Sequence, residues 1–494
     1  MSRAASTTDD QPAPSPEKPA SRAVRRKPAA ATPDGPTPQA AATRPQRRGP
    51  RPMHYHLGMT SALLTSSVAA LPMLRDGSLP WAPHLAERGA HLTQVMQGLE
   101  PAIIGGYVAA EAKRRLEALL AGVARYRDHP YVRDLPDPPV IWQEGATRLL
   151  DYGAADPAGF TPGEDGIRGE GRVALFVPSL VNRHYVMDLS RRRSLMRWLS
   201  VRGFRPLLVD WGVPEGAELD LAVEDYVASR LGRMIALANT LAGGPVPVVG
   251  YCMGGLLTIA GVQLARNAVS RMALMATPWD FAAGDTAERR LIRVLGRSML
   301  KTVEQTGSMP VDMLQILFVA TDPAMVPRKF RDFAALDPAS TAACDFVALE
   351  DWLNDGVPLA GPVARTVVHD WYGTNQPADG KWRVDGQIID PAALGDMPVL
   401  IAVPERDRIV PPPTAAALAE RLPRARLIRP AAGHIGMMVG SRSARELWEP
   451  LAHWLREEPV PAPAAPGGAP RRRATRAKAA TPAKSRSPRP AATL

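Results

Sequence analysis

The chain has 494 residues, enough for one large α/β domain with additions, and it contains two cysteines, Cys252 and Cys344. So few cysteines exclude a disulfide scaffold and fit a reducing cytoplasm, and no Cys/His cluster has zinc-site spacing, so we expect neither a metal nor a bound cofactor. The net charge of +11 belongs to the ends: residues 1–52 carry +6 and residues 459–494 carry +8, which leaves about −3 for residues 53–458.

The two ends are rich in Pro, Ala, Arg and Ser and have almost no large apolar side chains. Such segments cannot bury enough surface to offset the entropy lost on ordering, so we predict disordered basic tails over residues 1–52 and 459–494. Two interpretations of their charge remain open. The tails bind nucleic acid or another polyanion electrostatically, or they are solvated segments that aid solubility.

The sequence pattern of residues 53–137 predicts a helical N-terminal region. Residues 57–74 are uncharged, but they are barely long enough and only mildly apolar for a membrane span, so we expect a helix that docks on a core or on another apolar surface. Two further stretches have helical periodicity. One carries apolar residues at i, i+3, i+4 and i+7, namely Leu92, Val95, Met96 and Leu99, and the other is residues 109–120.

From Ile141 onwards, short apolar runs alternate with helical segments, which predicts a mostly parallel sheet in a catalytic domain over residues 138–458. The predicted strands are residues 173–177, 206–212, 246–249, 271–278, 399–403 and 426–428, and the predicted helices between and after them include residues 195–202, 221–242 and 444–456. Residues 281–372 interrupt this alternation with helical sequence that contains Met and Trp. We interpret this insertion as a cap over the active site.

The most informative stretch is Gly250-Tyr251-Cys252-Met253-Gly254, between an apolar strand and an apolar helix. It matches the nucleophile elbow Gly-x-Ser-x-Gly with cysteine in place of serine. Glycine is needed because the nucleophile stands on a tight, strained turn that leaves no room for side chains beside it. The alternative interpretation is a buried structural cysteine in a tight turn.

A thiol nucleophile needs a base, and the base needs an acid that fixes its tautomer. In the elbow fold the chain order is nucleophile, acid, histidine. Asp407 lies in the turn after the strand at 399–403, with Glu405 as the second choice for the acid, and His434 lies in a glycine-containing loop after the last strand. The oxyanion hole is predicted to use the backbone N–H of Met253 and a second N–H near Ser179 or Leu180, of which we choose Leu180.

Other candidate residues lack this positional argument. His184 is such a residue, and His369, in or next to the cap, either lines the substrate pocket or merely packs. Cys344 has no acid and histidine placed after it in the required order, so we interpret it as structural.

A thiol at the elbow suggests acyl transfer, because exchange of an acyl group between two thiols is close to thermoneutral. At this point the chain resembles the poly-3-hydroxyalkanoate synthases, which polymerise 3-hydroxyacyl-CoA on an α/β-hydrolase fold. The resemblance covers roughly residues 138–456 and rests on six segments. These are residues 179–183 with 187–189, residues 209–212, residues 250–255, residues 277–281, residues 407–411 and residues 433–436. They are most similar to the short catalytic subunits of the class that works with a second, non-catalytic subunit.

The resemblance implies that Cys252 carries the growing acyl chain. It further implies that His434 activates both Cys252 and the 3-hydroxyl of the incoming unit, and that Asp407 supports His434. It implies a 3-hydroxyacyl-CoA substrate, a homodimer with an opening cap, a possible second synthase subunit, and a cytoplasmic location on polyester granules. The family has histidine immediately after its catalytic aspartate, whereas this chain has Arg408.

Two other functions remain open at this point. One is a thiol hydrolase of acyl-CoA or polyester on the same fold. The other is a non-catalytic tethering protein on granules, which the complete set of Cys252, Asp407 and His434 disfavours.

Overall fold

The computed structural model describes residues 46–160, 171–284, 287–320 and 322–456. The two predicted tails lie outside the described residues, except for residues 46–52 at the end of the first. Everything described below belongs to one compact unit that begins at Pro45.

The core of this unit is an eight-stranded sheet in the order β1-β2-β6-β3-β7-β8-β13-β14. Its strands are β1 (Val140–Glu144), β2 (Thr147–Asp151), β3 (Arg172–Val177), β6 (Phe204–Asp210), β7 (Val246–Tyr251), β8 (Val269–Met275), β13 (Val399–Ala402) and β14 (Arg426–Ile428). Neighbouring strands from β6 across to β14 are parallel, whereas β2 pairs antiparallel with both β6 and the edge strand β1. This is the mostly parallel sheet that the sequence predicted, with an antiparallel edge that it did not.

Alternation of side chains along the strands divides the core between two faces of the sheet. In β3, Leu175 and Val177 belong to one buried cluster, whereas Ala174 and Phe176 belong to the other. Both faces are buried because helices cover each of them, as expected for a parallel sheet. The first cluster includes residues of helices α6, α7 and α13, and the second includes residues of α5 and α15. The bounds are α5 (Leu195–Ser200), α6 (Gly232–Ala242), α7 (Met253–Leu264), α13 (Pro412–Arg421) and α15 (Glu449–Leu455).

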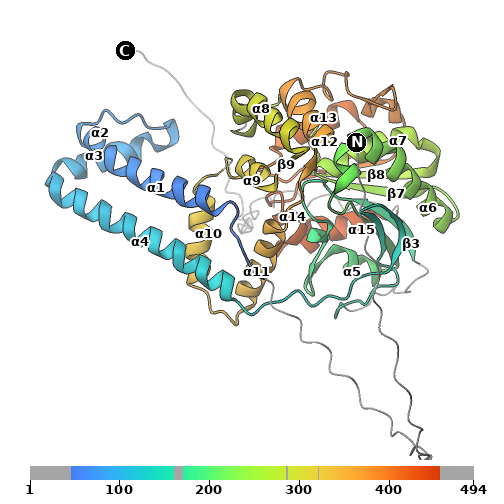
Figure 1. The fold of residues 1–494 in the computed structure, drawn as a ribbon, viewed down its shortest axis with the longest axis horizontal. Coiled ribbons are helices and arrows are strands. Elements are labelled where there is room, and N and C mark those ends of the chain that lie inside the picture. Colours follow the sequence, from blue (N-terminus) through green and yellow to red (C-terminus); the bar gives the residue numbers. More distant parts are fainter. Residues whose placement is uncertain (1–45, 161–170, 285–286, 321, 457–494) are drawn as a thin grey trace, which may run out of the picture. The chain divides into compact units, whose positions relative to one another are not determined.

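The insertion between β8 and β13 is mainly helical, as expected for a cap (Figure 1). Its elements are α8 (Ala287–Thr306), β9 (Ser308–Met309), α9 (Val311–Val319), α10 (Met325–Ala334), α11 (Thr341–Asn354), β10 (Leu359–Ala360), α12 (Gly361–Arg365) and the π-helical segment η6 (Thr366–Gly373). The strands β9 and β10 pair only with each other, so they do not extend the main sheet.

In the described residues, four α-helices precede the sheet: α1 (Met53–Ala69), α2 (Leu71–Asp76), α3 (Ala86–Gln97) and α4 (Pro101–Asp128). Figure 1 shows α4 beside the cap helix α10, and the two helices are in extensive contact. The predicted helices are present, but Leu92, Val95 and Leu99 are 41–48% exposed. The uncharged stretch forms most of α1 and part of α2, and it docks only in part: Leu57 packs against the buried cluster of α4 and α10, whereas Leu63 and Val68 are exposed. Docking of the rest on another apolar surface stays a prediction. Among the described helices, none is long and apolar enough to cross a membrane.

Candidate active site

Cys252 stands at the junction between β7 and α7. Its φ of 56° and ψ of −128° put a non-glycine residue in a strained region of backbone space. The backbone N–H of Cys252 donates to the carbonyl of Met275 on the neighbouring strand β8 at 2.8 Å, which fixes the turn to the sheet. This backbone is the strained strand-to-helix turn that the elbow sequence predicted.

The glycines of the elbow are required by close backbone contacts. A Cβ on Gly254 would lie 2.2 Å from the carbonyl oxygen of Val177 and 2.4 Å from that of Pro178. A Cβ on Gly255 would lie 1.8 Å from Oγ1 of Thr277, and one on Gly250 would lie 2.5 Å from Cα of Gly255. The helix that follows Cys252 can therefore approach β3 closely only because these positions lack side chains.

Asp407 and His434 form a direct pair in the loops that follow β13 and β14. Nδ1 of His434 lies 2.7 Å from Oδ2 of Asp407, and both side chains are buried. The other oxygen, Oδ1, accepts hydrogen bonds at 2.9 Å from the backbone N–H groups of Ile409 and Val410. Glu405 is exposed, so the structure pairs His434 with the first choice of acid and not with the second.

His434 also interacts with Cys252. Burial alone would lower the pKa of His434, but the negative charge of Asp407, that of Cys252 and side-chain hydrogen bonds to both residues raise it to about 10. Tyr251 contacts His434 in two ways. Its hydroxyl donates to the backbone carbonyl of His434 at 3.2 Å, and the two ring centroids lie 5.1 Å apart. The structure thus pairs His434 directly with Asp407, and the charge of Cys252 acts on the same histidine.

A cavity of about 480 Å³ opens over Cys252 and His434. Its walls come from the catalytic body, from the cap and from the chain segment before α1, and its lining is mainly apolar. Trp371, which follows His369 and Asp370, lines this cavity, whereas His369 itself is 61% exposed and pairs with Asp370. The volume and lining suit an organic substrate.

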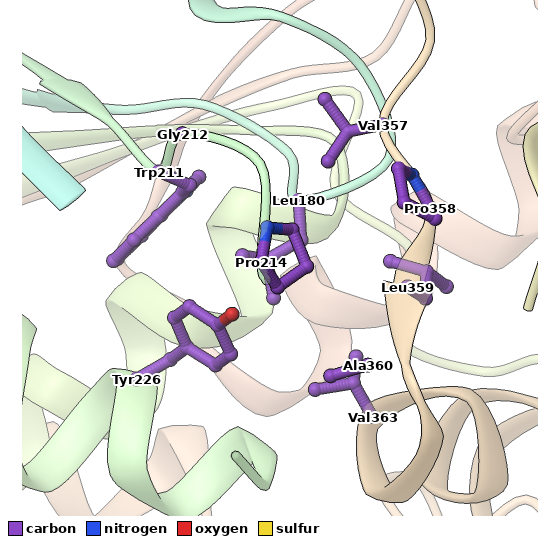
Figure 2. A pocket seen from close by; sticks show the side chains of 10 residues that line it. All are labelled: Leu180, Trp211, Gly212, Pro214, Tyr226, Val357, Pro358, Leu359, Ala360 and Val363. Carbon is purple, nitrogen blue, oxygen red and sulfur yellow. The ribbon is translucent and has the colours of Figure 1, made fainter. Parts of the chain in front are cut away.

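The two predicted oxyanion donors lie in different surroundings. Met253 is the first residue of α7, where backbone N–H groups lack an intrahelical acceptor, and it lines the cavity. Leu180 follows β3, but its side chain lies in a separate small pocket with Trp211, Pro214 and Tyr226 (Figure 2). Its chain neighbours Ser179 and Val181 line the cavity beside Cys252. Donation by the Leu180 backbone N–H stays a prediction.

The remaining candidates lie apart from this pair. Nδ1 of His184 is 2.9 Å from Oδ1 of Asp210 at the end of β6, and Cys344 lies in α11 of the cap. Within the described part of the chain, no three His, Cys, Asp or Glu side chains gather as metal ligands would.

Sequence reasoning missed the polar contacts that join the cap and the N-terminal segment to the site. Arg408, next to Asp407, makes an ion pair with Asp322 of the cap, and both residues line the cavity. Arg51 and His56, from before and within α1, line it as well. The only signal for any of them was the unusual Arg408, because the other contacts join residues far apart in the chain.

A family model described as "alpha/beta hydrolase fold" matches residues 224–441 of this chain, which agrees with the observed sheet and elbow. Among curated proteins, the poly(3-hydroxyalkanoate) polymerase subunit PhaC of Haloferax mediterranei is 28% identical over 323 residues, 64% of this chain and 63% of the relative. The subunit of the same name from Synechocystis is 29% identical over 292 residues, 57% of this chain and 77% of the relative.

This chain is a homologue of the poly(3-hydroxyalkanoate) polymerases. It spans less than two thirds of the length of the Haloferax mediterranei relative, and the similarity to the PhaC of Cupriavidus necator, at 28% identity, covers 56% of this chain and 49% of that relative. Among solved structures, a carboxylesterase of Nitrososphaera gargenis matches 65% of this chain and 98% of its own chain, with 14% identity and a TM-score of 0.39.

Proposed function

We propose that this protein is an acyltransferase that polymerises 3-hydroxyacyl-CoA into polyhydroxyalkanoate through an acyl group carried on Cys252. The observation that carries the proposal is the 2.7 Å contact of His434 with Asp407, together with the position of His434 and Cys252 in the lining of one mainly apolar cavity. The homology to proteins named as poly(3-hydroxyalkanoate) polymerases supports the same substrate class.

The first half of the reaction loads the enzyme. Because Nδ1 of His434 is paired with Asp407, its Nε2 is left to take the proton of the Cys252 thiol. The thiolate attacks the thioester carbonyl, and the negative oxygen that forms is stabilised by backbone N–H groups, of which Met253 supplies one and Leu180 the second. The carbon–sulfur bond to coenzyme A then breaks, and the leaving thiolate takes the proton from His434.

The second half extends the polymer. His434 removes the proton from the 3-hydroxyl of an acyl unit, and the resulting oxygen attacks the acyl group on Cys252. An ester bond forms, the bond to Sγ of Cys252 breaks, and the proton returns to the thiol. Water must be kept from the acyl-enzyme during this step, which is a role for the cap and the apolar lining.

The test is incubation of the protein with 3-hydroxybutyryl-CoA while coenzyme A release and insoluble polymer are followed together. We expect both products, and we expect both to be lost in Cys252→Ala. Release of coenzyme A with free hydroxy acid and no polymer would instead identify a thiol hydrolase, the alternative that shares the same three residues. A wild-type protein that released no coenzyme A with short or long acyl chains, with or without a second subunit, would favour a tethering protein.

The proposal extends to partners and location. We expect a homodimer on the surface of cytoplasmic polyester granules, with a second synthase subunit as a candidate partner. The basic tails, at residues 1–52 and 459–494, are candidates for binding nucleic acid or another polyanion. Granules whose position is unchanged by removal of residues 1–45 and 459–494, which keeps the buried Arg47 and its contacts in place, would contradict that role.

A further inference from the structure

The chain segment at residues 47–52, which we name the strap, forms part of the cavity that contains Cys252. Pro50 and Arg51 of the strap line this cavity together with Cys252 and His434. The strap lies before the first helix, α1, and therefore before every strand of the eight-stranded sheet. One part of the cavity wall thus comes from outside the sheet and the cap.

Arg47 anchors the strap to the cap. Its guanidinium donates to both carboxylate oxygens of Asp351 in α11, at 2.7 and 2.9 Å, and to the backbone carbonyls of His129 and Tyr131. The Arg47 side chain is only 2% exposed, and it lies over the ring of Tyr126, whose hydroxyl also donates to Asp351. A buried, bidentate arginine–carboxylate pair of this kind fixes a segment in one position.

The rest of the strap is fixed against the same helix and against α9. The backbone N–H of Arg51 donates to Oδ1 of Asn354 at 2.9 Å, and Nε of Arg51 donates to Asp312 at 3.0 Å. Gly49 lies so close to Asn354 that a Cβ on the glycine would come within 2.4 Å of the amide side chain. The strap therefore packs closely against the cap at and beside Arg51, which lines the cavity.

The strap adds a charged group to the cavity lining. Arg51 lines the cavity, as do His56 of α1 and an ion pair of Lys329 and Glu350 at 2.6 Å. Much of the remaining lining is apolar and includes Leu314, Leu317, Phe318, Val326 and Leu353. An alkyl chain gains free energy along the apolar lining but would have to desolvate charged groups where it reached the strap.

We propose that the strap sets the length of the acyl group that the cavity admits, with Pro50 and Arg51 as specificity-determining residues and Arg47 as the residue that positions them. This inference rests on the proposed function for the identity of the acyl group. The contribution of the strap to the cavity wall does not depend on that function, so it can be tested by a reaction of the Cys252 thiol that needs no catalysis.

The first measurement is the rate at which maleimides with short and long N-alkyl chains label Cys252, read by peptide mass spectrometry with Cys344 as the internal reference. The variants are Arg47→Ala, which releases the strap, and Arg51→Ala, which only shortens one wall residue. The matched control is Arg48→Ala, because Arg48 is the exposed neighbour of the anchor. We expect the ratio of long-chain to short-chain labelling to rise at least about tenfold in both test variants, and to stay at the wild-type value in the control.

An unchanged ratio in Arg51→Ala overturns the proposal, and so does an equal rise in Arg48→Ala. If Arg47→Ala fails to fold, as judged by its thermal melting, Arg51→Ala still decides the question. The second measurement compares kcat/KM for long and short 3-hydroxyacyl-CoA in the same variants, and the ratio is expected to shift in the same direction. A changed labelling ratio in a protein that releases no coenzyme A would uphold the strap and reject the proposed polymerase.

Discussion

His434 is a buried histidine whose charge is favoured by its surroundings. Burial opposes the charged form, but the negative charges of Asp407 and Cys252 and the hydrogen bonds to them outweigh that effect, so the pKa of His434 rises from 6.5 to about 10. A histidine whose charged form is favoured in this way can hold the proton that it takes from the Cys252 thiol.

The raised pKa predicts a pH dependence of stability. A group that binds its proton more tightly in the folded state contributes stability that is complete below the unfolded pKa of 6.5 and is lost as the pH rises through the folded pKa of about 10. We therefore expect the free energy of unfolding, measured by urea denaturation, to fall between these two values. The fall should be steeper in the wild type than in His434→Gln, which cannot titrate there.

Other groups titrate in the same pH range, so the test is the difference between the pH profiles of the wild type and His434→Gln. Parallel pH profiles for the wild type and His434→Gln would show that the pKa of His434 is not raised by folding.

At the scale of elements, the elbow is a strand, a turn and a helix that fit together only without side chains at its glycines. Since a Cβ on Gly254 would collide with two backbone carbonyls of the β3 strand and its exit, Gly254→Ala must move α7 or the loop. We expect Gly254→Ala to lower the free energy of unfolding by about 1–3 kcal/mol, measured by urea denaturation.

Gly244→Ala is the matched control, because a Cβ on Gly244 would meet nothing within 4 Å. Equal losses of stability in the two variants would mean that close packing at the elbow is not the reason for its glycine.

The elements of the catalytic domain could be read from the sequence because each leaves a local signal. Apolar runs such as residues 173–177 and 399–403 became β3 and β13, and the glycines around Cys252 marked the turn. The antiparallel strands β1 and β2 were not predicted, because they do not form continuous apolar runs like those of β3 and β13. β1 is exposed or half-buried throughout. The apolar periodicity near Leu92 predicted a helix correctly but not its exposure, which depends on what packs against it.

At the scale of the whole molecule, the N-terminal helices are joined to the cap through α4 and α10. Leu119, Val123 and Tyr126 of α4 share a buried cluster with Phe330 of α10. The helices approach so closely that a Cβ on Gly122 would lie 2.1 Å from the carbonyl oxygen of Phe330. This contact supports Tyr126 and hence the Asp351 carboxylate that holds the strap.

Two adjacent leucines of α4 test this contact. Leu119 is fully buried against the cap, whereas Leu120 is 45% exposed. We expect Leu119→Ala to lower the free energy of unfolding by about 2–5 kcal/mol and Leu120→Ala to change it by less than about 0.5 kcal/mol, measured by urea denaturation. Similar effects of the two substitutions would show that α4 is not packed on the cap as described.

The pairing of Asp407 with His434 could be predicted because the order of residues in this fold is fixed by the order of its strands. The contribution of the strap to the cavity could not. Arg47 and Asp351 are separated by 304 positions, and neither residue stands in a recognisable motif. Contacts of this kind are decided by how the helical regions pack, which leaves no local pattern in the chain.

An acyl group on Cys252 would change the mass of the protein, so mass spectrometry can detect it directly. The protein is mixed with 3-hydroxybutyryl-CoA, quenched in acid, and analysed as intact protein and as peptides. The account predicts a mass increase of one or more 3-hydroxybutyryl units on the peptide that contains Cys252, and none in Cys252→Ala. Release of coenzyme A without any acyl group on Cys252, or an equal adduct in Cys252→Ala, would contradict it.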